Sequence, residues 1–310
     1  MRRWLIFSAS VVMVLVAASF LRAQAPAVPD HRQWNNSPPA KAYYAGKKPS
    51  GPAPRRDLSG FWDGTAEGGI MGDGATEYPA VPPEGKKDDG ALGKPGHYGL
   101  PNENSIKHPP YTPLGEKALE ANKTGTGIRA VPPALVNDPV NNCEPQGFPR
   151  MELSEFRAIE LRQTKNHVIF LNQYLNNWRI IWTDGRPLPD INADPRWNGY
   201  SVGRWVDDYT FVVDTMGLRD STWIDTVGRP HSDQLRVEET FHRVDYDTME
   251  LSIKIDDPKM YTQPWMALNK YVLHRLPDNF DIEEFLCSPS EEAAYKKIIG
   301  SPASDSPAKQ

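Results

Sequence analysis

The chain has 310 residues, 24% of them charged, and its 40 acidic side chains outnumber 35 basic ones, for a formal net charge of −5. Acidic proteins are a poor match for nucleic acids and anionic membrane surfaces, because both attract clusters of Lys and Arg. The basic pairs of this sequence, such as Lys86-Lys87, are isolated and typical of solvated loops. We therefore expect no nucleic acid among its partners.

Residues 1–23 have the composition of a signal peptide. Two arginines follow Met1, the stretch Leu5–Phe20 is apolar, and Leu21-Arg-Ala23 is a small-residue ending that predicts cleavage after Ala23. The apolar stretch is short for a transmembrane helix, so we expect no stable membrane insertion after cleavage. An uncleaved membrane anchor is the alternative. We predict a periplasmic or secreted protein, with a mature net charge of −8 after the loss of three arginines.

Residues 24–150 hold most of the 30 prolines and many of the 23 glycines. Both residue types oppose regular structure, so we predict a largely irregular, extended region. Two elements stand out: a short strand at Leu58–Asp63, and a helix at about 112–123 for which Thr112 is a suitable N-cap. Residues 70–104 have little apolar periodicity, which favours a mobile segment to which we assign no role.

Residues 151–290 read as one β-strand after another. In Met249–Asp256, apolar side chains alternate with polar ones, the period-two pattern of a half-buried strand. Tight polar links such as Val206–Tyr209 indicate hairpins, and sequential hairpins form an antiparallel meander. We predict a mainly β fold in which this meander closes into a lipocalin-like barrel, or else forms a sandwich. The predicted strands are Phe156–Gln163, His167–Tyr174, Trp178–Thr183, Ser201–Val206, Tyr209–Asp214, Leu235–Val244, Met249–Asp256, Trp265–Arg275 and Phe280–Leu286.

The only two cysteines, Cys143 and Cys287, bracket this strand-rich region. Export would bring them to an oxidising compartment, so we predict that they form a disulfide bond; two buried thiols are the alternative. After Cys287, residues 291–310 are expected to form a short helix at Glu291–Ile299 and a disordered tail.

Large aromatic residues are concentrated in the β region, where rings can stack a flat ligand. With Arg204 and Glu239 as polar anchors, they predict a site for a small, largely apolar or aromatic molecule. Ordinary core packing of the same rings is the alternative. The aromatic candidates are Trp182, Trp205, Trp223, Tyr261 and Trp265.

Glu239 is expected to face the interior, because it shares its side of a strand with Leu235, Val237 and Phe241. A carboxylate among apolar neighbours must be paired or protonated, so we expect Arg204 or another inward Arg as its partner. A purely structural ion pair is an equally good interpretation.

The densest group of polar residues lies in the stretch 222–240. It contains His231, and Asp225 a few residues earlier, around a Gly-Arg-Pro turn. A histidine held by a carboxylate is a general base whose pKa falls near the working pH, and Arg204 would assist it. The alternative is a structural histidine bonded to its own turn. The sequence has no Gly-x-Ser-x-Gly motif, so we expect no serine nucleophile of that type.

The seven histidines show no spacing typical of metal ligands, so we predict no metal site. The sequence also lacks the glycine-rich and Cys-x-x-Cys-His motifs that bind nucleotides, phosphate or haem. We therefore predict no cofactor.

Several short motifs follow one another along the chain. They are Asp57-Leu-Ser-Gly-Phe-Trp62, Gly147-Phe-Pro-Arg150, Thr183-Asp-Gly-Arg-Pro187, Ser201-Val-Gly-Arg-Trp205, Phe211-Val-Val-Asp214, Pro230-His-Ser232, Asp256-Asp-Pro258, Tyr261-Thr262, Pro264-Trp265 and the final Cys287. In this combination the chain resembles a family of exported bacterial proteins of unassigned function. The resemblance spans most of the mature chain, apart from residues 70–104. It implies export and a shared β domain.

These observations lead to three functional hypotheses. The first is an exported β-barrel protein that binds a small, largely apolar or aromatic molecule. The second is a hydrolase, lyase or isomerase with His231 as general base. The third is an envelope protein-interaction module whose partner binds residues 24–150. The oligomeric state is left open.

Overall fold

The computed structural model describes residues 48–63, 109–125, 131–153, 158–190, 192–282 and 284–300. The predicted signal peptide, residues 70–104 and the predicted tail beyond residue 300 lie outside these ranges. None of the helices within them has the length and apolar character needed to span a bilayer.

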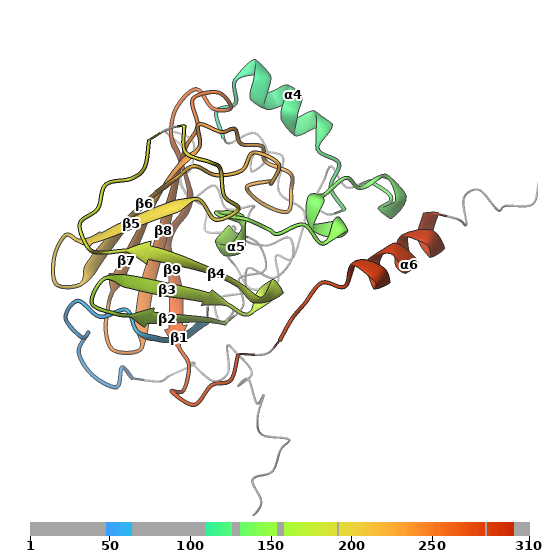
Figure 1. The fold of residues 1–310 in the computed structure, drawn as a ribbon. Helices are drawn as coiled ribbons and strands as arrows, with labels where there is room; N and C mark the ends of the chain where they lie inside the picture. The colour runs from blue at the N-terminus through green and yellow to red at the C-terminus, as the bar shows by residue number, and fades with distance from the viewer. Residues whose placement is uncertain are drawn as a thin grey trace, which may run out of the picture. The chain divides into compact units, whose positions relative to one another are not determined.

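The described residues form a closed barrel of nine strands, which confirms the predicted mainly β barrel (Figure 1). Neighbouring strands follow the chain order, and β1 closes the barrel by pairing with both β2 and β9. A strand from the region before residue 151 therefore completes the barrel. The strands are β1 (Gly60–Asp63), β2 (Ile159–Gln163), β3 (His167–Asn172), β4 (Asn177–Trp182), β5 (Tyr200–Trp205), β6 (Thr210–Met216), β7 (Arg236–Arg243), β8 (Thr248–Asp256) and β9 (Trp265–Arg275).

The strand pairing differs from a pure meander at one place. Strand β4 pairs with β5 in parallel, with Ile181 opposite Ser201, while the other eight neighbouring pairs among these strands are antiparallel. A parallel neighbour requires the chain to return to the end of the barrel from which β4 started. The connection 183–199 makes this return, and within it Leu188 lies beside Asp214 on the outer face of β6.

The predicted strand Phe280–Leu286 is wrong: its described residues have no β pairing. The physical reason is that β9 already pairs with β8 on one side and with β1 on the other. A closed barrel leaves no edge for a further strand. The segment instead leads out of the barrel toward Cys287.

The barrel has two ends that differ in their connections. We call the end formed by the short links 206–209 and 244–247 the turn end. We call the opposite end, formed by the longer connections 217–235 and 257–264, the loop end. Both names follow from the antiparallel order of β5 to β9.

The interior of the barrel is a packed core. Strand β8 alternates as predicted, with Met249, Leu251, Ile253 and Ile255 buried. Each apolar side chain of this size contributes about 1.5–3 kcal/mol when fully buried. The largest side chains removed from water include Trp62, Phe148, Phe170, Phe211 and Phe241. Buried side chains therefore occupy the interior of the barrel.

Helix α4 (Pro113–Ala121) confirms the predicted helix. The hydroxyl of Thr112 accepts a hydrogen bond from Gly115 N at 3.0 Å, and Pro113 occupies the first turn. A Cβ at Gly115 would lie 2.1 Å from the Met260 carbonyl oxygen, so only glycine allows this close approach. The backbone N–H of Thr112 also donates to Met260 O at 2.9 Å, which holds the start of α4 against the loop 257–264.

The remaining helices are short. The buried turn α5 (Arg150–Leu153) belongs to the core, whereas α6 (Pro289–Gly300) includes the helix predicted near the C-terminus. The 3-10 helices are η4 (Pro133–Leu135), η5 (Pro139–Asn142) and η6 (Tyr174–Asn176).

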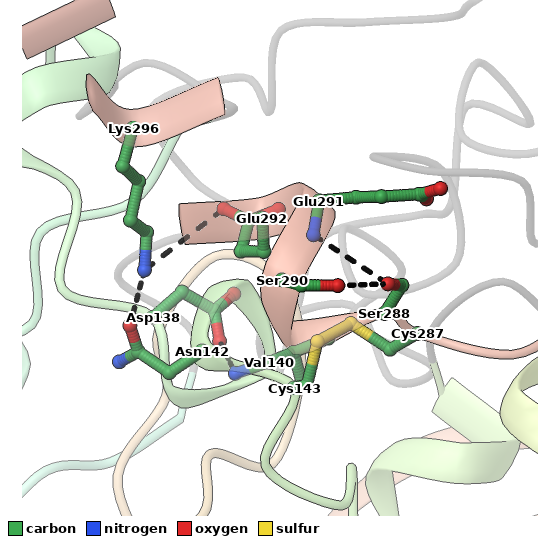
Figure 2. The surroundings of a disulfide bond; sticks show 10 residues. All are labelled: Asp138, Val140, Asn142, Cys143, Cys287, Ser288, Ser290, Glu291, Glu292 and Lys296. Atoms are coloured by element: carbon green, nitrogen blue, oxygen red, sulfur yellow. Dashed lines mark hydrogen bonds and ion pairs between the residues drawn. A yellow bond between two sulfur atoms is a disulfide. The ribbon is translucent and has the colours of Figure 1, made fainter. Parts of the chain in front are cut away.

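The predicted disulfide bond joins Cys143 to Cys287 (Figure 2). It links the end of η5 to the segment before α6, across 144 residues of sequence. In the chain-entropy model a loop of this length stabilises the fold by about 4–5 kcal/mol, through restriction of the unfolded chain. The bond therefore holds α6 to the segment that connects β1 to β2.

Candidate ligand site at the loop end

The loop end contains a cluster of buried polar side chains. Its residues come from the connections 217–235 and 257–264, where long loops cross the barrel between strands. Such a cluster is stable only if its groups are paired, because a buried polar group without a partner destabilises the fold. The members are Thr222, Asp225, Arg229, His231, Ser232, Asp257 and Tyr261.

Asp225 organises the turn that contains Gly228. Its Oδ1 accepts hydrogen bonds from Val227 N at 3.1 Å and Arg229 N at 3.2 Å, and its Oδ2 accepts from Arg229 Nη1 at 2.6 Å. Burial lowers the pKa of Arg229, but the attraction and hydrogen bond of Asp225, together with the charge interactions with Tyr111 and Tyr261, exceed this effect and the pKa is raised. Asp225 and Arg229 thus form a buried, hydrogen-bonded ion pair.

The predicted pairing of Asp225 with His231 is wrong in this geometry. The His231 ring lies 2.8 Å from Thr222 Oγ1 at Nε2 and 3.2 Å from the Ser232 carbonyl oxygen at Nδ1. Asp225 has the guanidinium of Arg229 four residues away, and a charged donor competes better for a carboxylate than a neutral ring does.

His231 is neutral near pH 7, because burial lowers its pKa and its contacts with Ser232 and Asp257 only partly offset that effect. A carbonyl oxygen can only accept, so Nδ1 carries the proton of the neutral ring. Nε2 lies 2.8 Å from the Thr222 hydroxyl, and the Arg219 carbonyl oxygen, at 3.2 Å, competes for the single proton of that hydroxyl. The basic nitrogen is therefore in contact with Thr222. His231 acts as a base toward a substrate only if Thr222 gives up this contact.

Asp257 connects the two loops. Its carboxylate accepts from Ser232 N at 2.5 Å and from Ser232 Oγ at 2.8 Å, and also from Lys259 N at 3.1 Å. These bonds fix the turn after β8 and orient the chain next to His231. Ser232 is engaged in this support and lies beside the histidine in sequence, so its hydroxyl does not form a nucleophile–base pair.

Three aromatic rings form a continuous wall at the loop end. Tyr261 lies 5.2 Å from Tyr111 and 5.3 Å from Trp265 between ring centroids, so two of the predicted aromatic candidates, Tyr261 and Trp265, are in contact. Tyr261 is buried and donates to Pro230 O at 2.7 Å, whereas Tyr111 and Trp265 are half-buried. We call Tyr111, Tyr261 and Trp265 the ring wall.

Polar groups border the ring wall. The Arg229 guanidinium carbon lies 5.7 Å from the Trp265 ring, a distance that permits cation–π attraction. The indole N–H of Trp265 is buried and has no hydrogen-bond partner among the described residues. An unpaired buried donor of this kind costs about 1–3 kcal/mol. The ring wall thus combines apolar surface with one unused donor.

The other predicted aromatic residues do not join this wall. Trp182 and Trp205 lie at the ends of β4 and β5 near the turn end, where Trp182 stacks on Arg186 at 3.6 Å and Trp205 packs on Phe211 at 5.2 Å. Trp223 is at the loop end but is buried 5.6 Å from Arg150. A single ligand wall containing all predicted tryptophans is therefore not formed.

Arg204 was expected inside the barrel and lies outside. Its guanidinium pairs with Asp214 on the outer face, and its side chain is largely exposed. The neighbouring Gly203 faces the core, where a Cβ would meet Phe211 at 2.3 Å, and alternation along β5 turns Arg204 outward. Arg204 is thus neither near His231 nor a partner of Glu239.

Glu239 faces the interior and is paired, as predicted, but its partner is Arg179 of β4. The guanidinium Nη2 of Arg179 donates to Glu239 and to Glu152 of α5, the latter at 2.9 Å. All three side chains are buried. Phe148 stacks over Arg179 at 3.9 Å, which places the chain before α5 across the same group.

The interior cluster of Glu152, Arg179 and Glu239 holds two carboxylates against one guanidinium. Burial, followed by repulsion from Glu239, raises the pKa of Glu152 well above its ordinary value. Burial and the second carboxylate therefore favour the protonated form of Glu152. Arg179 Nη2 links the two carboxylates, whereas Glu152 Oε2, Glu239 Oε2 and the Nε and Nη1 atoms of Arg179 are buried without a hydrogen-bond partner among the described residues.

Within the described part of the chain, no three His, Cys, Asp or Glu side chains are grouped so as to hold a metal ion. The chain matches no family model, no curated protein and no solved structure. The resemblance to exported bacterial proteins therefore stays a prediction.

Proposed function

We propose that this chain is an exported β-barrel protein that binds a small, largely apolar or aromatic molecule on the ring wall at the loop end. The observation that carries the proposal is the half-buried surface of Tyr111 and Trp265, with the unused indole N–H beside Arg229. The packed interior argues for a ligand on the end of the barrel rather than inside it.

The chemistry of the ring wall favours a flat ligand that carries a hydrogen-bond acceptor. Stacking of one aromatic ring on another contributes about 0.5–1.5 kcal/mol beyond the burial of apolar surface. An acceptor that reaches Trp265 Nε1 would also remove the unfavourable free energy of its unpaired donor. The two effects together select aromatic ketones, phenols or heterocycles over plain hydrocarbons.

Titration of intrinsic tryptophan fluorescence with a library of aromatic metabolites tests this proposal. Trp265→Phe keeps a ring but loses the N–H, so an acceptor-bearing ligand should bind about tenfold more weakly. Trp178→Phe is the matched control, because Trp178 is 57% exposed on β4, which β1, β2 and β3 separate from Trp265 on β9 in the barrel order. Equal affinities in the two variants would contradict the proposed site.

Export is part of the same proposal. The disulfide bond between Cys143 and Cys287 is compatible with an oxidising compartment such as the periplasm or the exterior. Cell fractionation followed by mass spectrometry of the intact protein would test it. We expect a chain that begins at Gln24 in the exported fraction, and a chain that retains residues 1–23 in the cytoplasm would contradict it.

An enzyme with His231 as general base is the second candidate. The observation in its favour is the lowered pKa of His231, which leaves the imidazole in its basic form at neutral pH. His231→Gln should then abolish turnover and change the melting temperature by less than about 2 °C. A large loss of stability would identify His231 as a structural residue.

The third hypothesis, a partner that binds residues 24–150, falls mostly outside the described residues and stays a prediction. Deletion of the whole region is no longer a suitable test, because β1 (Gly60–Asp63) is part of the barrel. Deletion of residues 24–47 leaves β1, α4 and α5 intact. Loss of a partner from pull-downs with this shorter variant would support the hypothesis.

A further inference from the structure

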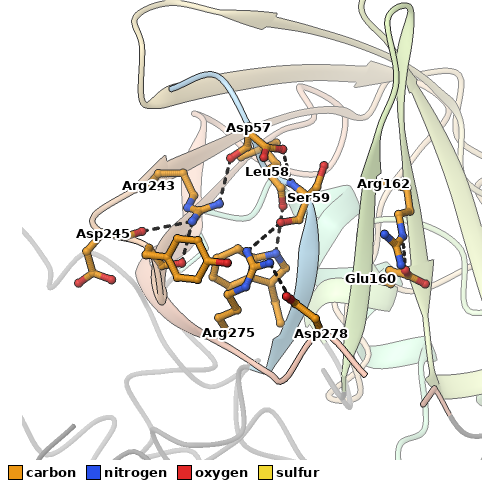
Figure 3. Close-up of polar contacts among 11 residues, drawn as sticks. Asp57, Leu58, Ser59, Glu160, Arg162, Arg243, Asp245, Arg275 and Asp278 are labelled. Atoms are coloured by element: carbon orange, nitrogen blue, oxygen red, sulfur yellow. Dashed lines mark hydrogen bonds and ion pairs between the residues drawn. The ribbon is translucent and has the colours of Figure 1, made fainter. Parts of the chain in front are cut away.

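Two arginines close the turn end of the barrel. Arg243, at the end of β7, is 1% exposed and donates to the carbonyl oxygens of Asp57 at 2.9 Å, Tyr246 at 2.8 Å and Asp245 at 3.3 Å (Figure 3). Its hydrogen-bond acceptors are therefore backbone carbonyls, which leave the guanidinium charge in place.

Arg275, at the end of β9, lies beside Arg243. The Trp62 ring is 4.6 Å from the guanidinium carbon of Arg243 and 5.8 Å from that of Arg275. Tyr246 lies 4.6 Å from Arg275 and holds it from another side. A Cβ at Gly60 would be 2.9 Å from Arg275 Nη1, so the side chain fills the space above this glycine. Arg275 is thus fixed in position.

Arg275 has one hydrogen-bond partner in the backbone and one in an exposed side chain. Nη1 donates to Ser59 O at 3.1 Å, and Nη2 donates to Asp278 Oδ1 at 2.8 Å (Figure 3). The side chain of Asp278 is 77% exposed, and an ion pair with such a group contributes about 0–1 kcal/mol. Another carboxylate can therefore replace Asp278 at little cost in free energy.

The electrostatics of the turn end favour an anion. Burial, and then the charge of Arg275, lower the pKa of Arg243 to about 10, although Asp57 and Asp245 attract the proton. Two of the local carboxylates already accept backbone bonds: Asp57 from Ser59 N at 2.8 Å, and Asp245 from Asp247 N at 2.8 Å. A further negative charge would relieve the repulsion between the two arginines.

A cavity of about 310 Å³ opens beside Arg275. Its volume is at the small end of the range for ligand sites, which is about 300–1,000 Å³. The cavity offers an ammonium, a guanidinium, an imidazole, hydroxyls and a phenol ring, together with two carboxylates: Asp278, and Asp247, which accepts a hydrogen bond from Ser50 N at 2.5 Å. The lining residues that carry the argument are Lys48, Tyr246, Thr248, His274, Arg275 and Asp278.

We infer that this cavity is a second site, which binds a small organic carboxylate. The carboxylate displaces Asp278 from Arg275 Nη2, and the body of the ligand lies along Tyr246 toward Lys48. The contact of Asp278 with Arg275 shows that carboxylate geometry fits this guanidinium. The site lies at the end opposite the ring wall and does not rest on the proposed function.

Calorimetric titration of the full-length chain with benzoate, succinate and inorganic phosphate tests the inference. We expect binding of a carboxylate and an increase in affinity of about three- to fivefold in Asp278→Asn, because the internal competitor loses its charge. Asp233→Asn is the matched control: Asp233 is a similarly exposed aspartate that pairs with Lys259 near the loop end, so its loss should not change the affinity.

Two further variants separate binding from folding. Arg275→Gln should weaken carboxylate binding about tenfold or more, and Lys48→Ala, at an exposed position, should weaken it without loss of stability. Trp265→Phe should leave it unchanged, which separates this site from the ring wall. No carboxylate binding, binding of phosphate alone, or equal affinity in Asp278→Asn and the wild type would each overturn the inference.

Discussion

The two ends of the barrel stabilise their buried arginines in different ways. At the loop end, Arg229 pairs with Asp225, and Arg150 donates two hydrogen bonds to Asp138 at 2.8 and 2.6 Å. At the turn end, the acceptors of Arg243 among the described residues are backbone carbonyls, and the partner of Arg275 is an exposed aspartate. The arginine charges at the loop end are neutralised by buried carboxylates of the same chain. At the turn end, the exposed pairing of Arg275 leaves room for the negative charge of a bound anion.

This difference connects stability to function. A buried carboxylate that matches each arginine makes the loop end rigid, so its ring wall is presented in a fixed shape. An arginine that is held by carbonyls keeps its full charge, so the turn end can attract an anion. The two proposed sites thereby differ in the ligand chemistry that they would select.

Removal of Arg179 should have the largest effect on stability. Arg179→Met leaves Glu152 and Glu239 buried without a cation, which should lower the free energy of unfolding by about 3–5 kcal/mol. Urea unfolding at neutral pH measures the loss. Adding Glu152→Gln and Glu239→Gln to this variant should restore part of the lost free energy of unfolding. A loss below about 1 kcal/mol in Arg179→Met alone would contradict the importance of the interior cluster for stability.

Replacing the aspartate partner of an arginine by asparagine should destabilise the protein at the loop end and have little effect on stability at the turn end. Asp225→Asn leaves Arg229 buried without a counter-charge and should cost about 3 kcal/mol. Asp278→Asn removes an exposed partner of Arg275 and should change stability by less than about 0.5 kcal/mol. Equal losses in the free energy of unfolding for the two variants, measured by denaturant unfolding, would contradict the difference between a buried ion pair at the loop end and an exposed one at the turn end.

The pH dependence of stability should report on His231. Its folded pKa lies below the unfolded value, so the unfolded chain binds more protons as the pH falls through about 6.5, and stability is lost. The slope should not exceed about 1.4 kcal/mol per pH unit for this group. Between about pH 5 and 7, His231→Gln should flatten the curve. An unchanged slope would contradict the buried neutral imidazole.

Much of the barrel could be predicted from local patterns. The alternation in Met249–Asp256 and the polar turns near Val206 and Val244 depend on neighbours within a few residues, and the structure confirms these strands and links. The parallel pairing of β4 with β5 could not be predicted this way. The connection 183–199 has the same turn-forming residues as a long hairpin loop, and only its path distinguishes the two.

The polar partners were harder to predict. Glu239 was correctly placed inside, but its partner Arg179 is 60 residues away and Glu152 lies in a single helical turn without periodicity. At the loop end, the sequence does contain a signal for the true partner of Asp225. Arg229 is four residues from Asp225 and is charged, so it was a better partner for that carboxylate than His231.

The most direct test of the central claim compares two indole N–H groups by NMR during titration with an aromatic ligand. Trp62 lies in the packed core and donates to Leu58 O at 3.1 Å, whereas the buried indole N–H of Trp265, a ring-wall residue, has no hydrogen-bond partner among the described residues. If the ligand binds at the ring wall, we predict a large shift of the Trp265 indole resonance and none for that of Trp62. A shift of the Trp62 indole resonance with that of Trp265 unchanged would place the ligand inside the barrel and contradict the proposed site at the ring wall.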